Sequence, residues 1–173
     1  MVRNEQNPER IDTTRCGVVY FCRWTMRHVE VIANVGGRPA GELFLLLCDM
    51  RQYPNYSDQI LSLEIAPSAN GSLVSKWTVK LGPGTATWTQ QDDLEPETNT
   101  IRFRGLSGDI DYFSGAWTVR DNGAQSVLTF ACDFDIGLPG FGNLIEPRIA
   151  KLLSENIRAI FRGMFGADAI QQE

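Results

Sequence analysis

From Arg27 onward, apolar and polar residues alternate along most of the chain, and short turn signals interrupt the alternation. A period of two predicts β-strands with one buried face. Turns such as Asn70-Gly71 and Asn122-Gly123 join consecutive strands as hairpins, so we expect an antiparallel sheet. The strands expected from this pattern are Arg27–Val35, Ile60–Pro67, Leu73–Leu81, Thr85–Leu94, Thr100–Leu106, Ile110–Arg120 and Val127–Ile136.

Two segments change from a period of two to helical signals. A short helix is expected from Pro39 to about Met50, ended by Tyr53-Pro54. A long amphipathic helix follows the last strand, and Gly166 ends it. Its apolar face consists of Leu144, Ile145, Ile149, Leu152, Leu153, Ile157, Ile160, Phe161 and Met164. Together these elements predict an α+β domain in which a curved seven-stranded antiparallel sheet surrounds a long C-terminal helix and leaves an internal cavity.

The same pattern divides the chain into three parts. Residues 1–25 lack clear periodicity and are expected to form an N-terminal extension, partly disordered, with an extra strand over Gly17–Arg23 as an alternative. Residues 26–166 are expected to form one ligand-binding domain, and residues 167–173 a C-terminal tail.

Charge and composition narrow the classes of partner. The net charge of −5 repels phosphate backbones, so no nucleic-acid partner is expected. The apolar runs Gly17–Cys22 and Leu43–Cys48 are too short for a signal peptide or a membrane span. We therefore expect a cytoplasmic protein without an integral membrane segment. A single histidine, His28, and four cysteines without a C-x-x-C pair predict neither a metal site nor a cofactor.

Strand alternation assigns the side chains that face the long helix. The expected inward set is Ser75, Trp77, Val79, Ala86, Trp88, Gln90, Asp92, Phe113, Trp117 and Phe130. On the fifth strand, the apolar Ile101 and Phe103 alternate with Arg102 and Arg104, and one of these two sets must face inward. On the apolar face of the last helix lies Asn156, a buried amide that needs hydrogen-bond partners or a ligand.

Five local strings occur along this order of elements. They are Tyr53-Pro54 after the first helix, Trp88 on the central hairpin, Gly108 through Trp117-Thr118, Phe134-Asp135 before a Gly/Pro loop, and Asn156. Together they resemble the polyketide cyclase/dehydratase branch of the START/Bet v 1-like (SRPBCC) superfamily, which includes aromatase/cyclases and quinone-binding proteins. The resemblance covers roughly residues 27–165. It implies the helix-grip (Bet v 1-like) fold and a hydrophobic small molecule, a polyketide, quinone or lipid, as the partner.

The resemblance also implies a site. It places Arg104 inside the cavity and matches Asn156 to a buried asparagine of the cyclases. It further matches Trp88 and Trp117 to cavity tryptophans, and Tyr53 to an aromatic residue at the cavity mouth.

Two positions depart from the cyclases, which carry a second arginine where this chain has Asp92, and a tyrosine where this chain has Ile60 or, nearby, Tyr56. Asp92 is expected either to act as a base or to pair with Arg104. The local alternation favours Phe103 inside, whereas the resemblance favours Arg104 inside, and our prediction follows the resemblance. Ile101 and Phe103 would then need cover from the N-terminal extension or from a second copy in a homodimer.

The function implied is that of a cofactor-free polyketide cyclase/dehydratase that catalyses an aldol-type cyclisation or a dehydration. The candidate catalytic residues are Arg104, Asp92 and Asn156, and the candidate substrate-binding residues are Tyr53, Trp77, Trp88, Gln90, Phe113, Trp117 and Phe130. Two alternatives remain open: a lipid or quinone carrier without turnover, and an interaction protein with a filled core.

Overall fold

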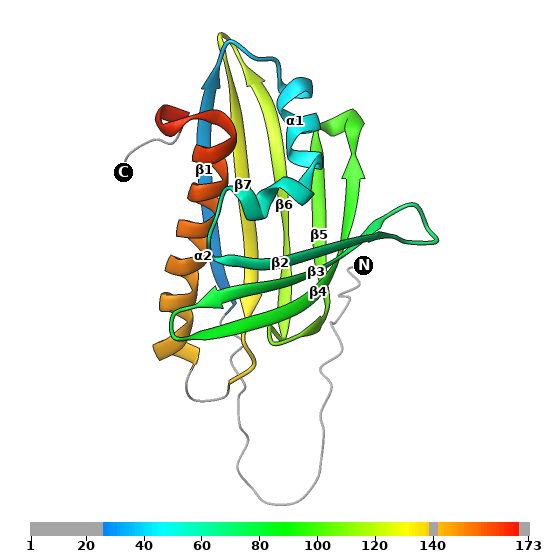
Figure 1. Cartoon of the computed structure of the whole chain (residues 1–173). Helices are drawn as coiled ribbons and strands as arrows, with labels where there is room; N and C mark the ends of the chain where they lie inside the picture. Colours follow the sequence, from blue (N-terminus) through cyan, green and yellow to red (C-terminus); the bar gives the residue numbers. More distant parts are fainter. Residues whose placement is uncertain (1–25, 139–141, 170–173) are drawn as a thin grey trace, which may run out of the picture.

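Seven antiparallel strands form one sheet in the order β1-β7-β6-β5-β4-β3-β2 (Figure 1). The computed structural model describes residues 26–138 and 142–169. The strands are β1 Arg27–Gly36, β2 Ile60–Pro67, β3 Leu73–Leu81, β4 Gly84–Glu95, β5 Thr100–Gly108, β6 Tyr112–Asn122 and β7 Gln125–Asp135. The predicted seven-stranded antiparallel sheet is confirmed, while the predictions for residues 1–25 lie outside the described residues.

Two α-helices and three short 3₁₀ helices complete the described structure. They are α1 Ala40–Cys48, η1 Met50–Asn55, η2 Pro96–Thr98, α2 Gly142–Phe165 and η3 Ala167–Ala169. The first helix ends at Cys48 rather than near Met50, because Asp49 leaves the helical conformation with ψ 61°. The chain then tightens into η1, which contains Tyr53 and Pro54. At the other end, η3 lies within the predicted C-terminal tail and contacts β1.

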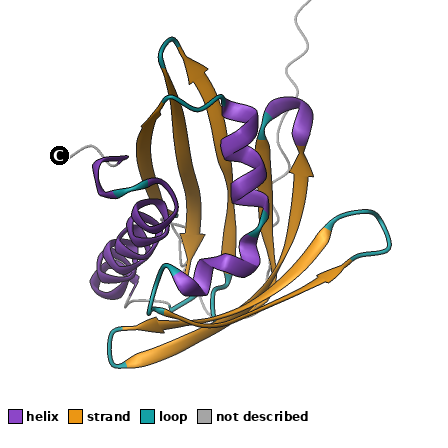
Figure 2. Cartoon of the chain, turned by 45° about the horizontal axis from the view of Figure 1, so that its top comes forward, coloured by secondary structure: helices purple, strands orange, loops and turns teal. Residues whose placement is uncertain are grey.

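The sheet bends sharply at β5. This strand pairs with β6 over Thr100–Arg104 but pairs with β4 as far as Gly108. Gly108 has a φ of 131°, and a Cβ at this position would overlap the carbonyl oxygen of Thr87 on β4. A glycine is therefore required where the two strands approach each other. Beyond this bend, β2, β3 and β4 cross in front of the other strands and give the sheet a deep concave side (Figures 1 and 2).

The long helix α2 lies on this concave side, as predicted (Figure 2). It contacts β1 and β7, and its residues Ile157, Ile160 and Phe161 are buried against the sheet. The inward positions of β3 to β7 contribute mainly aromatic side chains to the same core. The interior is therefore an aromatic layer between a bent sheet and one helix.

Candidate ligand-binding site

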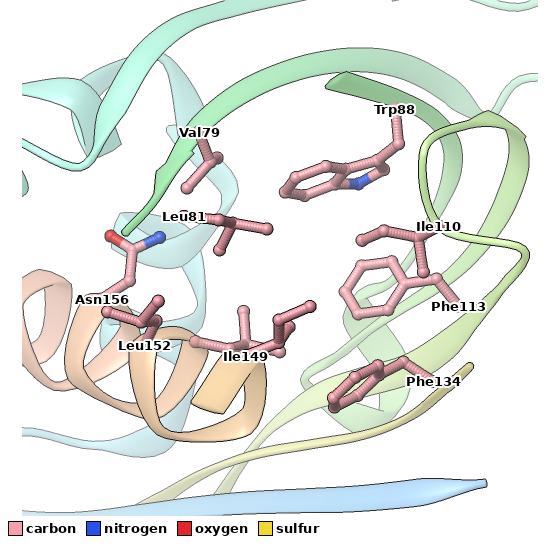
Figure 3. Close-up of a pocket in the computed structure, with 10 residues that line it drawn as sticks. Val79, Leu81, Trp88, Ile110, Phe113, Phe134, Ile149, Leu152 and Asn156 are labelled. Carbon is pink, nitrogen blue, oxygen red and sulfur yellow. The ribbon is translucent and has the colours of Figure 1, made fainter. Parts of the chain in front are cut away.

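Two small pockets lined by described residues lie between α2 and the concave face of the sheet. One has a volume of about 30 Å³ and is lined by Trp77, Trp88, Gln90, Phe103, Phe113, Trp117, Phe130, Leu153, Asn156 and Ile157. The second, of about 20 Å³, shares Trp88, Phe113, Leu153 and Asn156 with the first and is drawn in Figure 3. Each volume suffices for about one or two water molecules. The interior is therefore almost filled in this structure.

A larger hollow of about 260 Å³ lies at the surface, between the β3–β4 turn and the first turns of α2. Leu81, Ile149 and Leu152 line both this hollow and the smaller internal pocket. At its rim, Leu144 is 76% exposed. Three aliphatic side chains thus separate the solvent from the interior at this end of the molecule.

The wall opposite α2 is built on a pair of tryptophans. Trp77 on β3 and Trp88 on β4 are directly opposite in the sheet, and their rings stack in parallel with centroids 5.9 Å apart and planes 1° apart. Trp117 on β6 packs edge-on against Phe130 on β7 with a centroid distance of 4.7 Å. Strand pairing therefore brings these aromatic side chains together on the inner face of the sheet, because opposite residues of an antiparallel sheet point to the same face.

A chain of four hydrogen bonds connects five side chains on β3 and β4, and the two tryptophans are among them. Trp88 Nε1 donates to Gln90 Oε1 (2.8 Å), and Gln90 Nε2 donates to Asp92 Oδ1 (2.6 Å). On the neighbouring strand, Trp77 Nε1 donates to Ser75 Oγ (2.9 Å), and Ser75 Oγ donates to Asp92 Oδ2. Asp92 accepts from both branches, so this carboxyl joins the two tryptophans.

Asp92 is fully buried, with 0% of its surface exposed. Burial raises the pKa of this carboxyl from 3.8 to about 6, although the hydrogen bonds from Ser75 and Gln90 act in the opposite direction. Asp92 does not itself line either internal pocket; Gln90 lies between it and the pocket of about 30 Å³. The site therefore contains a carboxyl that changes charge near neutral pH, one hydrogen bond away from the pocket.

The predicted position of Arg104 is wrong. Arg104 is exposed on the outer face, where its Nη2 donates to Gln91 Oε1 (2.8 Å), whereas Phe103 is 3% exposed and lines the internal pocket. The register explains this outcome, because Asp92 lies directly opposite Phe103 and opposite residues share a face. Once Asp92 points inward, Arg104 must point outward. The predicted convergence of Arg104 with Asp92, as an ion pair or a catalytic pair, is therefore wrong as well.

The predicted cover for the apolar residues of β5 is not needed. Ile101 and Phe103 both lie in the core, and the arginines that alternate with them face solvent. Arg102 Nε contacts Glu95 Oε1 at 2.8 Å. Arg102 and Arg104 border a hollow of about 460 Å³ on the outer face, separate from the interior.

The structure places Asn156 as expected, on the buried face of α2. It is 4% exposed, it lines both internal pockets, and its Oδ1 has no hydrogen-bond partner in the described part of the chain. Figure 3 shows the amide at the edge of the smaller pocket, beside Val79 and Leu152. A buried acceptor without a partner is costly, so this position suits contact with a polar ligand.

Tyr53 is not at the mouth of a cavity, and this prediction is wrong. Its side chain is fully buried, its Oη donates to the carbonyl oxygen of Leu47 (2.7 Å), and burial raises the pKa of its phenol. It packs against Trp117 and Trp77 with centroid distances of 5.5 and 6.2 Å. Tyr53 therefore packs against the rings of the tryptophan wall and lines neither of the two internal pockets.

The other predicted binding residues come together. Trp77, Trp88, Gln90, Phe113, Trp117 and Phe130 all line the pocket of about 30 Å³. Phe103 is missing from the predicted binding residues, and Ser75 was predicted to face inward but without a role in the site. Counting back from the turn at Gly82-Pro83 places Ser75 opposite Gln90.

In residues 26–138 and 142–169, no group of three potential metal ligands comes together. Neither of the helices in these residues combines the length and apolar character that crossing a membrane requires.

Comparison with known proteins first identifies the fold class. The bent antiparallel sheet around one long helix is the helix-grip fold of START/Bet v 1-like proteins. The family model "Polyketide cyclase / dehydrase and lipid transport" matches residues 37–161, and the chain belongs to this family. The resemblance inferred from the local strings is thereby confirmed.

Three relatives illustrate the match. The actinorhodin polyketide synthase bifunctional cyclase/dehydratase of Streptomyces coelicolor is 25% identical over 122 residues, which cover 67% of this chain and 39% of that protein. The chain therefore spans well under half the length of the curated relative. TTHA0849 of Thermus thermophilus superposes with a TM-score of 0.72 at 20% identity, covering 82% of this chain and 96% of that one.

The third relative is the Zhui aromatase/cyclase from a Streptomyces species, with a TM-score of 0.60 at 24% identity, covering 80% of this chain and 96% of that one. At these identities, both solved structures show a shared fold.

Proposed function

We propose that this protein binds a hydrophobic polyketide-type molecule between the tryptophan wall and α2, and promotes its cyclisation or dehydration without a cofactor. The observation that carries the proposal is the buried carboxyl of Asp92 behind this wall. A domain that needed only a core would be more stable with an apolar residue here, because burying a carboxyl costs free energy. Membership of the cyclase/dehydrase family supports the same class of reaction.

The chemistry requires proton transfer at two places. Aldol cyclisation removes a proton from the carbon beside one carbonyl and adds a proton to the oxygen of another, and dehydration then releases water. A group with a pKa close to the working pH both accepts and returns a proton, and burial gives Asp92 a pKa of about 6. We assign proton transfer to Asp92, which a ligand reaches by taking the place of the Gln90 amide at Oδ1.

The amides of Gln90 and Asn156 are assigned to binding. Both line the pocket of about 30 Å³, on opposite sides of the interior: Gln90 on β4 and Asn156 on α2. The aromatic side chains of Trp77 and Trp88, which line the same pocket, suit contact with the unsaturated rings that cyclisation of a polyketide creates.

Binding also requires the interior to widen, because the two pockets hold about one or two water molecules each. We propose that the first turns of α2 separate from the β3–β4 turn to admit the ligand. Leu81, Ile149 and Leu152 lie at this boundary and line both the surface hollow and the internal pocket.

A carrier of a lipid or quinone, without turnover, is the second candidate. One observation favours it: every residue that lines the two internal pockets is uncharged. A ligand held by apolar contacts and two amides needs no proton transfer. The two candidates differ in the role of Asp92, which the carrier would not require.

The test uses a synthetic poly-β-keto thioester as the probe, with product formation followed by mass spectrometry. We expect the rate to rise as the pH increases through about 6, where Asp92 ionises. Asp92→Asn should lose turnover and still bind the probe, whereas the neighbouring Asp93→Asn should retain both. Binding without turnover by the unaltered protein would support the carrier, and the absence of binding would refute both candidates.

A further inference from the structure

Some hydrogen-bonding groups of the inner pocket have partners within the protein, and others have none among the described residues. Gln90 Oε1 accepts from Trp88, and Gln90 Nε2 donates one hydrogen to Asp92. The second hydrogen of this amide has no partner in the described residues. Across the same pocket, Asn156 Oδ1 is buried and likewise lacks a partner in this part of the chain. The pocket of about 30 Å³ therefore presents one free donor and one free acceptor.

A hydroxyl group is the ligand function that satisfies both, because it donates one hydrogen bond and accepts others. A ketone or ether oxygen accepts from Gln90 but leaves Asn156 Oδ1 without a partner. Leaving a buried acceptor unpaired weakens binding by about tenfold or more. The complementarity of the pocket therefore favours a hydroxyl over a carbonyl at this position.

The carboxyl of Asp92 also disfavours ligands that carry a carboxylate. The carboxyl of Asp92 lies one hydrogen bond behind Gln90, and the two arginines of β5 point to the opposite face of the sheet. A ligand carboxylate in the pocket would therefore meet a like charge and no arginine from β5. Two carboxylates at such a site repel each other and resist ionisation.

From these observations we propose that the pocket selects planar aromatic ligands that carry a neutral hydroxyl, as in a phenol or an enol, at their buried end, and discriminates against carboxylates. This inference rests on the proposed function, because it assumes that a ligand enters between the tryptophan wall and α2, and it concerns the bound ligand before proton transfer, while Gln90 still donates to Asp92. The aromatic lining of the pocket accounts for the planar aromatic ligand, and Asn156 accounts for the hydroxyl.

The experiment uses three naphthalenes substituted at the same position by hydroxyl, methyl or carboxylate. Methylnaphthalene matches naphthol in size but forms no hydrogen bond, and naphthoate adds a charge. Affinities are measured by titration of tryptophan fluorescence at pH 8 for the unaltered protein, for Asn156→Leu and for a control, Glu155→Gln. Glu155 neighbours Asn156 on α2 but is exposed, so its substitution should leave every affinity unchanged.

We expect naphthol to bind about tenfold more tightly than methylnaphthalene, and naphthoate to bind most weakly. In Asn156→Leu the advantage of naphthol should disappear, while methylnaphthalene keeps its affinity. Equal affinities for naphthol and methylnaphthalene, or a preference for naphthoate, would overturn the inference and leave the proposed function standing. If none of the three binds up to its solubility limit, the proposed function itself fails, and the inference fails with it.

Discussion

Replacing Asp92 by asparagine should stabilise the folded protein, and should do so only above a defined pH. The pKa of the buried carboxyl is raised from 3.8 to about 6, so the folded protein binds this proton more tightly than the unfolded chain. The stability that this group contributes is fully present below pH 3.8 and is lost as the pH rises through about 6. Asparagine has a similar shape, still accepts from Gln90, and carries no charge to bury.

The magnitude follows from the two pKa values. The difference between 3.8 and about 6 corresponds to about 3 kcal/mol at pH values above both. Urea denaturation of both proteins between pH 4 and 8 should therefore give nearly equal stabilities at the acid end. The advantage of Asp92→Asn should grow mainly between pH 3.8 and about 6, and should level off at about 3 kcal/mol above that range.

A neighbouring residue provides a control of opposite sign. Hydrogen bonds from Ser72 and Gln91 lower the pKa of Asp93, so its contribution is present above the unfolded pKa and is lost as the pH falls. Asp93→Asn should therefore lower stability at neutral pH, where Asp92→Asn raises it. A loss of stability in Asp92→Asn at pH 8, or a difference that does not vary with pH, would refute the argument.

Further substitutions test the placement of the other site residues. Asn156→Leu should raise the free energy of unfolding by about 1–3 kcal/mol, because it removes an unpaired buried acceptor; a lower value would show that Oδ1 is satisfied. Phe103→Ala should lower the same free energy by about 3–5 kcal/mol, whereas Arg104→Ala should change it by less than about 0.5 kcal/mol. If the two effects were reversed in thermal or urea denaturation, the assignment of faces on β5 would be wrong.

The fold was predictable because its signals are local. Alternation locates each strand, turns such as Asn122-Gly123 join them as hairpins, and the apolar spacing through Ile149 and Ile160 defines α2. The same alternation identifies Trp77 and Trp88 as inward-facing, and the structure places both in the wall of the pocket. Each of these inferences needs only the residues within one element and its turn.

The polar part of the site was only partly predictable, because it depends on register between strands. Alternation turns Phe103 inward, and the error at Arg104 came from giving a distant resemblance more weight than this local pattern. The hydrogen bond from Ser75 to Asp92 joins two strands across a hairpin, so recognising it required the register as well as the faces. The position of Tyr53 was predicted wrongly because η1, which packs this side chain against the tryptophans, has no periodic signal in the sequence.

The central claim is that a flat hydrophobic ligand occupies the interior between the tryptophan wall and α2. The most direct measurement is an NMR titration with naphthol that follows the indole N–H signals of ¹⁵N-labelled tryptophan. We expect the signals of Trp77, Trp88 and Trp117 to shift together and to saturate, since these rings line the pocket of about 30 Å³. The claim would be contradicted if these three signals stayed in place while the backbone signals of Arg102 and Arg104, beside the outer hollow, shifted instead.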